Sequence, residues 1–581
     1  MDFKRTIDIL PYALANHPLD NCLAAKENGK WKTYSTQDFS DKVSQMSHAL
    51  IELGVKPGDK ISSITNNRPE WNFLNFAVAR VGAILCPMYP TISAEDYVYI
   101  FNHAEIKFVF VSDEEILEKV KKAKIDVPTI EGIYTFNQIE GAKHWTEVLK
   151  LGSNQHEEEI TKRMDAIKEQ DLVTIIYTSG TTGKPKGVML SHQNLISNAI
   201  AGIPLLPCDV GDKALSFLPV CHVFERTLLN IYVMGGISIY YAESLETIGD
   251  NIKEIKPEIF SAVPRLIEKV YDKITLGGSQ KPAPLKQIFF WAVKRANSYE
   301  IGAPQGILGK IANKLVYSKV REGLGGNVKV IVSGSAALQT RLQRFFWGVG
   351  LPILEGYGLT ETSPIIAVNT LLKKGTQFGT VGKVIENVSV RIAEDGEILT
   401  KGPNVMLGYY KAPQLTEEVM SEEWFHTGDI GIFKHGFLKI TDRKKQMFKT
   451  SGGKYIAPGP IENMFKASPF IEQIMVIGEG KKHASALIIP SFAYTKGWAK
   501  ENGLNCKTND EICSNNEVIG AINKEIKTYN EHLGKTEQIK RFELISKEWT
   551  VEGGELTPTM KAKRKPILAK YEHLVKKIYN E

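Results

Sequence analysis

Cysteine is scarce in this sequence, and no two cysteines form a CxxC pair. Structural zinc sites are usually built from such closely spaced thiols, so the pattern argues against one. Secreted domains rely on dense disulfides, whereas sparse cysteines are typical of a reducing compartment. We therefore predict a cytoplasmic protein. The six cysteines are Cys22, Cys86, Cys208, Cys221, Cys506 and Cys513.

Long hydrophobic runs are also absent. A helix needs roughly 20 apolar residues to cross a bilayer, and the nearest candidate, residues 231–242, is interrupted by Gly235 and Gly236. Residues 1–8 place an acid inside what would be the apolar core of a signal peptide, so we do not expect secretion. Peripheral attachment to the inner face of a membrane stays open, through residues 231–242 or through a lysine-rich helix expected over residues 561–581.

Neither sign of charge is in large excess. The chain of 581 residues has 72 Lys and Arg against 66 Asp and Glu, a net charge of +6. So small a charge gives no reason to expect a nucleic-acid partner, although it permits attraction to a polyanionic ligand or an anionic membrane. A chain this long exceeds one hydrophobic core, so we expect at least two domains. Its oligomeric state stays open, and a homodimer is one option.

A strand–helix–strand pattern occurs twice in the first half of the chain. Residues 58–90 have it first, with Pro69 near the start of the helix, and residues 211–241 repeat it. Strands that alternate with helices indicate a mostly parallel sheet covered on both faces. Residues 265–326 look largely helical, with an interruption at Lys-Pro-Ala-Pro, residues 281–284.

The pattern changes toward the C-terminus. From about residue 375 to 441 short strands alternate with turns, and the charged run at 442–445 marks a shift in composition. We therefore predict an α/β fold with two domains. The larger, residues 1–441, would hold two doubly wound βαβ subdomains and a small β-rich subdomain. The smaller, mobile one, residues 442–581, would be α+β.

The run from Tyr177 to Gly187 mixes glycines, hydroxyls and lysines after an apolar strand-like segment. Glycines let the backbone approach an anion, and lysines supply charge, so the run predicts a phosphate-binding loop before a helix starting within 188–192. A surface turn is the alternative. The loop is not a Walker A motif. That motif has four residues between its first glycine and its Gly-Lys pair, whereas here only two residues separate Gly180 from the Gly-Lys pair. The predicted phosphate ligands are Thr178, Ser179, Gly180, Thr181, Thr182, Lys184 and Lys186.

A second glycine-rich segment, Glu355 to Thr362, follows a predicted strand. An aromatic side chain between glycines, Tyr357, can stack on a flat base. An acid beside hydroxyls, Glu361, can hold a hard cation such as Mg²⁺ through oxygen. A turn between strand and loop is the alternative.

Three further side chains stand in short motifs. Asp429, expected after a tight turn, could accept hydrogen bonds from both hydroxyls of a ribose, although a solvated turn is a common fate of such an aspartate. Lys561 could stabilise negative charge in a transition state, or could simply begin a basic helix. His222 could line a substrate pocket, or be structural.

Taken in order along the chain, these segments resemble the acyl-adenylate-forming superfamily of acyl-CoA synthetases, peptide-synthetase adenylation domains and luciferases. The resemblance covers nearly the whole chain from about residue 30. The local forms PVCHVFER, EGYGLTET, WFHTGDIG, ITDRKKQMFK and LTPTMKAKR are similar to the long-chain fatty acyl-CoA synthetase branch. Short-chain members typically have a Gly-Arg and an acidic hinge where this chain has Asp442-Arg443 and Lys445, which weakens any transfer of their substrate details.

The resemblance implies how ATP and Mg²⁺ are bound. Tyr357 would stack on adenine and Glu361 would hold the Mg²⁺ that bridges the triphosphate, with Thr360 near the phosphates. Asp429 would bind the ribose, and Arg443 the ribose or a phosphate. The remaining nucleotide-pocket residues would be Gly334, Ser335, Ala336, Glu355, Gly356 and Gly358.

The resemblance also implies a moving C-terminal domain. It would pivot at Lys445, bring Lys561 to the α-phosphate for adenylation, and then present Gly452 and Gly453 to the pantetheine of CoA. His222 would flank the substrate carboxylate as a second catalytic residue.

The expected function is therefore ATP-dependent conversion of medium- to long-chain fatty acids to acyl-CoA through an acyl-AMP intermediate, with release of AMP and pyrophosphate. Two alternatives stay open. One is a fatty acyl-AMP ligase that loads a carrier protein, although the insertion typical of such relatives is not seen between Lys445 and Gly459. The other is a non-catalytic nucleotide- or lipid-binding relative.

Overall fold

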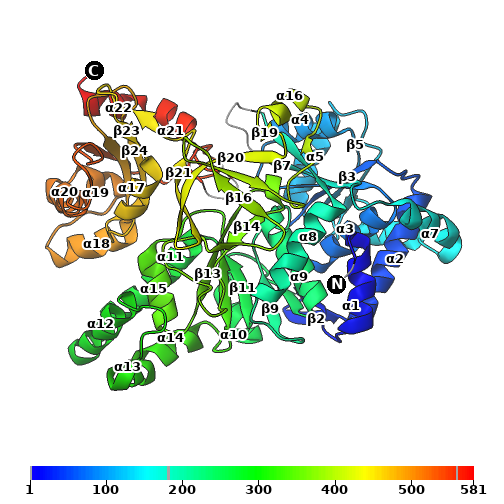
Figure 1. Ribbon diagram of the computed structural model, residues 1–581, viewed down its shortest axis with the longest axis horizontal. Coiled ribbons are helices and arrows are strands. Elements are labelled where there is room, and N and C mark those ends of the chain that lie inside the picture. The colour runs from blue at the N-terminus through cyan, green and yellow to red at the C-terminus, as the bar shows by residue number, and fades with distance from the viewer. Residues whose placement is uncertain (1–2, 179–183, 552, 558–560) are drawn as a thin grey trace. The chain divides into compact units, whose positions relative to one another are not determined.

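The computed structural model describes residues 3–178, 184–551, 553–557 and 561–581 (Figure 1). The chain divides into two compact units. The first comprises Met1–Arg391, Leu399–His426 and Lys434–Leu438, and the second Ile392–Ile398, Thr427–Phe433 and Lys439–Glu581. Among the described residues, no helix combines the length and apolar character that crossing a membrane requires.

The first predicted strand–helix–strand unit is confirmed. β3 (Lys60–Ile64) and β4 (Ile84–Met88) are parallel neighbours joined by α3 (Pro69–Arg80), which has Pro69 in its first turn. They lie in a seven-stranded sheet of order β18-β8-β7-β4-β3-β5-β6. Its other strands are β5 (Ile106–Val111), β6 (Gly132–Thr135), β7 (Leu172–Thr178), β8 (Lys186–Ser191) and β18 (Gly408–Tyr409).

The sequence predicts that a helix begins within residues 188–192. This prediction is wrong for residues 188–191. Residues 186–191 form β8, which pairs antiparallel with β7, so Thr178 lies opposite Lys186. Val188 and Leu190 are buried on this strand, an alternation that suits a strand better than a helix. α8 (His192–Gly202) begins only after Ser191, whose side chain caps it. The predicted phosphate loop therefore joins two strands.

The second predicted unit is also confirmed. β9 (Lys213–Ser216) and β10 (Ser238–Tyr241) are parallel and joined by α9 (Val223–Gly235). Their nine-stranded sheet has the order β15-β14-β13-β12-β11-β9-β10-β1-β2. Its remaining strands are β1 (Leu23–Glu27), β2 (Lys30–Tyr34), β11 (Ile259–Ala262), β12 (Val330–Ser333), β13 (Ile353–Gly358), β14 (Ile365–Val368) and β15 (Lys383–Val384).

The largest core cluster joins these two sheets through the helices between them. It includes Leu85 of β4, Tyr241 of β10, Trp71 of α3 and Leu228 of α9, all nearly inaccessible to water. The apolar run 231–242, considered above as a membrane contact, is part of this interior: Ile231, Tyr232, Val233 and Met234 are buried. The expectation of a membrane contact through this run is therefore wrong, because the run forms the end of α9 and the whole of β10 in the interior.

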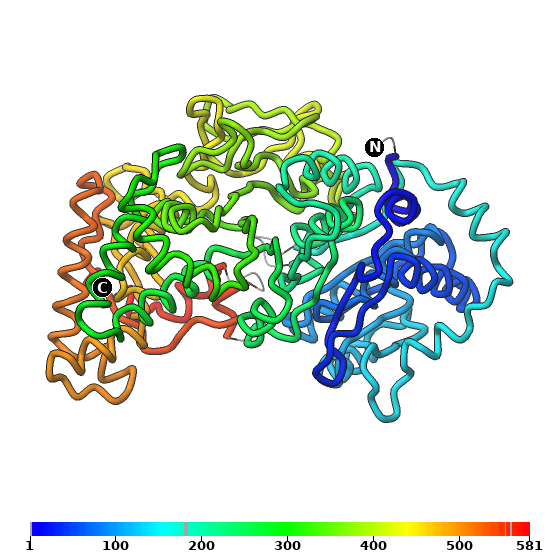
Figure 2. Tube along the Cα trace, turned by 90° about the horizontal axis from the view of Figure 1, so that it is seen from below, coloured from blue at the N-terminus to red at the C-terminus, as the bar shows by residue number. Residues whose placement is uncertain are grey.

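Other helices of the first unit cover the sheets or extend from them. Residues 265–326 are largely helical as predicted, but the interruption ends earlier because the next helix already starts at Ala283. The helices are α1 (Ile9–Asn16), α2 (Thr36–Glu52), α4 (Ala94–Ala104), α5 (Glu114–Lys124), α6 (Trp145–Leu151), α7 (Glu157–Ala166), α10 (Ile248–Ile255), α11 (Pro264–Ser279), α12 (Ala283–Asn297), α13 (Gly306–Ala312), the π-helix η4 (Asn313–Tyr317), α14 (Ser318–Gly323), α15 (Thr340–Gly348) and α16 (Pro413–Glu417). In Figures 1 and 2, α12 and α13 (green) lie at one end of this unit and α7 (cyan) at the other.

The predicted β-rich region forms a five-stranded sheet of order β16-β17-β20-β19, with β21 paired to β20. The boundary between the two units falls within β20 and β21. The strands are β16 (Ser389–Ile392), β17 (Glu397–Lys401), β19 (Met420–Ser421), β20 (Trp424–Lys434) and β21 (Phe437–Arg443).

The remainder of the second unit is α+β. A hairpin of β22 (Phe448–Lys449) and β23 (Tyr455–Ile456) precedes a three-stranded sheet of order β24-β25-β26. The C-terminal segment is broken at Tyr571 into two helices rather than one. The elements are β24 (Ile471–Ile477), β25 (Ser485–Pro490), β26 (Phe542–Leu544), α17 (Pro458–Phe465), α18 (Phe492–Glu501), α19 (Asn509–Ser514), α20 (Asn516–Asn530), α21 (Arg564–Lys570) and α22 (Glu572–Tyr579).

Candidate active site

The described ends of the predicted phosphate loop carry two lysines that lie against aromatic rings. Lys184 Nζ is 5.2 Å from the ring centre of Tyr99, and Lys186 Nζ is 4.9 Å from that of Tyr409. Such contacts hold a cation without neutralising it. Of the two, Lys186 lies opposite Thr178 in the pairing of β7 with β8. Of the other predicted phosphate ligands, Ser179, Gly180, Thr181 and Thr182 lie outside the described residues.

Glu361, the predicted Mg²⁺ ligand, lies in a 3₁₀ turn of residues Thr360–Thr362. Its Oε1 accepts a hydrogen bond from Tyr409 Oη at 2.9 Å, and its carbonyl oxygen accepts one from the Met406 N–H at 2.9 Å. Asn404 Nδ2 donates to the carbonyl of Thr362 at 3.0 Å. Residues 404–409 therefore fix both the backbone and the carboxylate of this turn.

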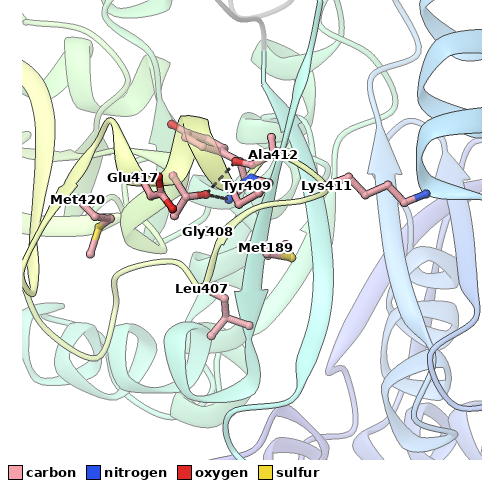
Figure 3. Close-up of a pocket in the computed structure, with 10 residues that line it drawn as sticks. Met189, Leu407, Gly408, Tyr409, Lys411, Ala412, Glu417 and Met420 are labelled. Carbon is pink, nitrogen blue, oxygen red and sulfur yellow. Dashed lines mark hydrogen bonds between the residues drawn. The ribbon is translucent and has the colours of Figure 1, made fainter.

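Tyr409 is a site residue that sequence reasoning missed. Its β18 pairs with β8, so Tyr409 lies opposite Val188, and its own N–H donates to Thr416 Oγ1 at 2.9 Å (Figure 3). The ring contacts Lys186 while the hydroxyl holds Glu361. In the sequence, Gly408-Tyr409-Tyr410 before Pro413 is typical of a turn, and only the pairing of two distant strands gives it this position.

A surface depression borders the backbone of this segment. Figure 3 shows Lys411 pointing away from its other lining residues, where its Nζ pairs with Glu105 at 3.0 Å. The lining residues are Met189, Leu407, Gly408, Tyr409, Lys411, Ala412, Pro413, Thr416, Glu417 and Met420. The Tyr409 hydroxyl is hydrogen-bonded to Glu361 and therefore does not serve the depression. The depression is thus an outer feature of the same segment.

The predicted adenine-pocket residues lie on neighbouring elements. Gly334, Ser335 and Ala336 directly follow β12, and Gly356 and Tyr357 lie within the adjacent β13. A side chain at Gly334 would come within 3.8 Å of the Gly356 carbonyl oxygen. The fold thus brings the two predicted segments together.

Gly358 ends β13 where the chain approaches Pro364 closely. A Cβ at Gly358 would lie 1.6 Å from the Pro364 carbonyl oxygen, so only glycine fits. This approach sets the turn that carries Thr360.

Glu355, also predicted to bind the nucleotide, is directed toward protein groups instead. Its Oε1 accepts from the Leu338 N–H at 3.0 Å, and its Oε2 accepts from the Gln343 side chain. Burial raises the pKa of this carboxyl to about 8. Its contacts give it the task of fixing the loop after β12 against β13.

His222 caps the start of α9, where its Nδ1 accepts from the Phe224 N–H at 3.1 Å.

The next helical turn is anchored on both sides. Arg226 Nη1 and Nη2 donate to Thr174 Oγ1 at 2.6 Å and Asn75 Oδ1 at 2.7 Å, and burial lowers its pKa to about 9. Glu225 accepts from two buried serine hydroxyls. These two neighbours, which sequence reasoning did not assign, tie α9 to both sheets and so position His222.

Glu225→Gln is expected to flatten the dependence of thermal stability on pH. Burial raises the pKa of the Glu225 carboxyl to about 7, while the carboxyl in the unfolded chain has a pKa of about 4.3. Between these values the unfolded chain releases its proton and the folded chain keeps it, so stability falls as pH rises. Glutamine removes this titration, and the hydroxyls of Ser216 and Ser261, each 2.6 Å away, can bond an amide in either direction.

The measurement for Glu225 is the melting temperature of variant and wild type across pH. The variant's Tm relative to wild type should rise by about 2 to 5 °C between about pH 5 and about pH 8. The exposed control Glu417→Gln should show a constant difference. A constant difference for Glu225→Gln as well would contradict the buried titration.

In the second unit, Asp429 and Arg443 come together. Arg443 Nε donates to Asp429 Oδ1 at 2.8 Å, and the Asp429 N–H donates to Thr427 Oγ1 at 3.1 Å. Asp429 lies inside the long strand β20, so its expected place after a tight turn is wrong. Pairing of the surrounding strands, rather than a turn, holds the carboxylate. Lys445 is exposed and follows β21 by two residues.

Gly452 and Gly453 form the turn of the β22–β23 hairpin. Gly453 has a φ of 75°, which favours glycine, and the Thr450 N–H donates to the Lys454 carbonyl at 3.0 Å. Lys561 is held through its backbone: its N–H donates to Thr557 Oγ1 at 3.0 Å and its carbonyl accepts from the Thr557 N–H at 2.8 Å.

Two family models match this chain. The description "AMP-binding enzyme" applies to residues 12–410, and "AMP-binding enzyme C-terminal domain" to residues 445–581. A long-chain-fatty-acid–CoA ligase of Mycobacterium bovis is 34% identical over 95% of this chain and 93% of its own length. Long chain acyl-CoA synthetase 3 of Arabidopsis thaliana is 32% identical over 100% of this chain and 92% of its own.

The fold has close counterparts among solved structures. An anthranilate CoA ligase solved in complex with anthranoyl-AMP aligns with a TM-score of 0.75 and 19% identity, covering 98% of each chain. At this identity the likeness concerns the fold alone, a large N-terminal α/β domain with a smaller C-terminal one. The family model covers more than half of the chain, and relatives above 30% identity span nearly all of it. This chain therefore belongs to the AMP-binding enzyme family.

Proposed function

We propose that this protein is an AMP-forming fatty acyl-CoA synthetase acting on medium- to long-chain fatty acids, with ATP and CoA as its other substrates. The observation that carries the proposal is the link from Lys186 through Tyr409 to Glu361, which fixes a cation and a carboxylate beside the β7–β8 hairpin. The related long-chain acyl-CoA ligases of bacteria and plants support the choice of acid.

The residues at this site fit a magnesium ion. Glu361 offers hard carboxylate oxygen, Mg²⁺'s preferred donor, and Tyr409 orients it by holding one of its two oxygens. Glu361 would hold the ion, with Thr360 beside it near the phosphates. When bound, Mg²⁺ neutralises charge on the triphosphate. Lys184, Lys186 and the hydroxyls of the loop would hold the phosphate oxygens.

In the first half-reaction, a fatty carboxylate oxygen attacks the α-phosphorus of ATP, and the bond to the β-phosphate breaks to release pyrophosphate. Tyr357 would stack on adenine, Asp429 would bind the ribose hydroxyls, and Arg443 would orient Asp429. Lys561 would stabilise the charge that builds on the α-phosphate and on the attacking oxygen. His222 would flank the carboxylate.

In the second half-reaction, CoA thiolate attacks the acyl carbon, and AMP leaves with the former carboxylate oxygen. We propose that residues 442–581 rotate about Lys445 relative to residues 1–441 between the two steps. The rotation would withdraw Lys561 and present Gly452 and Gly453 to pantetheine. The exposure of Lys445 supports a pivot there, because a hinge needs an adaptable backbone.

CoA is favoured as the acyl acceptor over a carrier protein. Between Lys445 and Gly459 the chain forms only the short β22–β23 hairpin and the start of α17, with no inserted element. A non-catalytic binder is less favoured, because the sequence retains both Lys561 and Glu361. The six free cysteines support a reducing compartment, which we take to be the cytoplasm.

The test is a product assay by mass spectrometry, with ATP, Mg²⁺ and fatty acids from short to long, with and without CoA. Acyl-CoA formed only when CoA is present, and most from longer acids, is the expected result. Acyl-AMP that accumulates without a thioester would indicate carrier loading. Absence of adenylate with every acid would refute fatty acid activation.

Tyr409→Phe is expected to raise the Mg²⁺ concentration needed for half-maximal pyrophosphate exchange by about 3- to 10-fold, because it removes one hydrogen bond that orients Glu361. The ring stays against Lys186, so the apparent KM for ATP should change less. Tyr410→Phe, at the neighbouring position, is the matched control. An unaltered Mg²⁺ dependence for Tyr409→Phe would rule out its role in positioning the carboxylate.

A further inference from the structure

Exposed large apolar side chains are concentrated in residues 276–319 of the first unit, which we call the helical patch. On α12, Leu285, Ile288 and Trp291 are 54%, 36% and 37% exposed, although this helix buries Phe289 and Val293 on another side. α12 therefore has a buried face against the unit and a second apolar surface in contact with water. Soluble proteins rarely leave such side chains grouped without a partner.

The run of α13 and η4 presents the clearest stripe of the patch. Ile307, Ile311 and Leu315 recur every fourth residue, so they lie on one side of the helix with Leu308 beside them. Ile307 is 78% exposed, Ile311 42%, Leu315 44% and Leu308 55%. The stripe is a continuous apolar strip about two turns long.

The patch is one packed surface rather than separate loops. The ring of Phe289 fills the space that a side chain at Gly278 would take, which joins α11 to α12. Arg295 Nη2 donates to the Gln305 carbonyl at 2.6 Å, and Tyr317 Oη donates to the Ala292 carbonyl at 2.9 Å. These bonds fix α13 and η4 against α12. Figure 1 shows α12 and α13 at the same end of the unit.

The charge of the patch has one sign. Residues 276–319 hold one acid, Glu300, whose Oε1 pairs with Arg344 Nη2 at 2.7 Å outside the segment. The same segment holds seven basic residues. Within the described chain, none of the six lysines among them forms an ion pair. The basic residues are Lys281, Lys286, Lys294, Arg295, Lys310, Lys314 and Lys319.

We propose that residues 276–319 form a docking surface for an anionic lipid bilayer. The exposed apolar side chains would enter the boundary between headgroups and acyl chains, and the lysines would meet lipid phosphates. The segment's excess of six positive charges equals that of the entire chain, and this concentration distinguishes a phosphate-rich membrane from a mixed protein surface. The inference stands independently of the proposed chemistry.

The two surfaces expected from the sequence are less suitable. Residues 231–242 are buried, and three of the four lysines in α21 and α22 are engaged by acids: Lys570 pairs with Glu555, Lys576 Nζ with Glu572 at 2.8 Å and Lys577 Nζ with Glu543 at 2.9 Å. An occupied lysine gains little from a lipid phosphate, since it must first give up its partner.

The test is flotation of the full-length protein with vesicles of phosphatidylcholine containing phosphatidylserine, compared with phosphatidylcholine alone. We expect wild type to float with the anionic vesicles and the double variant Ile307→Ser with Leu308→Ser to lose at least about tenfold in partition coefficient. Lys310→Glu with Lys314→Glu should lose as much on anionic vesicles and little on neutral ones. Unchanged Tm values would establish that the variants are folded.

Matched controls separate the patch from general surface effects. Leu371→Ser with Leu372→Ser removes two apolar side chains that are 39% and 61% exposed elsewhere on the first unit. Lys122→Glu with Lys124→Glu makes the same charge change on α5. Both should float like wild type. Wild type that stays in the soluble fraction, controls that lose as much as the patch variants, or a wild-type dimer in size-exclusion chromatography that the patch variants abolish without any vesicle binding would each overturn the proposal.

Discussion

Lys561→Ala is expected to lower acyl-AMP formation by about 100- to 1000-fold, which corresponds to about 3 to 4 kcal/mol of transition-state stabilisation. The ammonium would act only while charge builds on the α-phosphate and the attacking oxygen. Thioester formation from acyl-AMP supplied in advance should therefore be nearly unchanged. Single-turnover assays of the two half-reactions measure this difference directly.

A suitable control for Lys561 is Lys565→Ala, which removes an exposed lysine in the first turn of α21, four residues away. It should leave both half-reactions at wild-type rates. The hydrogen bonds between Thr557 and Lys561 involve the backbone of the lysine, so alanine preserves them. Equal loss in both half-reactions would indicate that Lys561 maintains the fold of its unit or binds AMP in general, and would refute its assignment to adenylation.

Glu361→Gln is expected to reduce pyrophosphate exchange by about 100-fold at ordinary Mg²⁺ concentrations. The amide oxygen can still accept the hydrogen bond from Tyr409, so the shape of the turn is retained while the negative charge that attracts the cation is lost. Activity should recover in part at high Mg²⁺. A titration of exchange rate against Mg²⁺ for wild type and variant is the measurement.

Glu417→Gln provides the comparison for Glu361, because it removes an exposed carboxylate from α16, close in sequence to Tyr409. Its titration should superimpose on that of wild type. If Glu361→Gln loses activity to the same extent at every Mg²⁺ concentration, the carboxylate acts in some way other than holding the metal.

Local sequence patterns predicted the strands and helices whose apolar residues are close together in the chain. The βαβ units around α3 and α9 followed from runs of apolar residues with turn signals between them, since burial on both faces of a parallel sheet leaves an unmistakable apolar pattern. The phosphate-binding loop was predicted for a similar local reason. The strand that follows it was not predicted, because β8 forms by pairing with β7, and strand pairing depends on a partner more than on propensity.

The site residues divide in the same way. Glycine-flanked Tyr357, Glu361 and Lys561 were selected from the sequence because their chemistry is visible in the residue types around them. Tyr409 was not, because its hydroxyl meets Glu361 only through the pairing of β18 with β8, which joins residues more than 200 positions apart in the chain.

The α/β class and the order of the chemical groups along the chain could be predicted from residue types and short-range periodicity. Only the folded structure fixes which side chains are buried and which are paired. It placed residues 231–242 in the core, enclosed Glu225 and Arg226 between two sheets, and left the lysines and one apolar side of α12 and α13 exposed. Burial and pairing are properties of distant neighbours, and no local pattern specifies them.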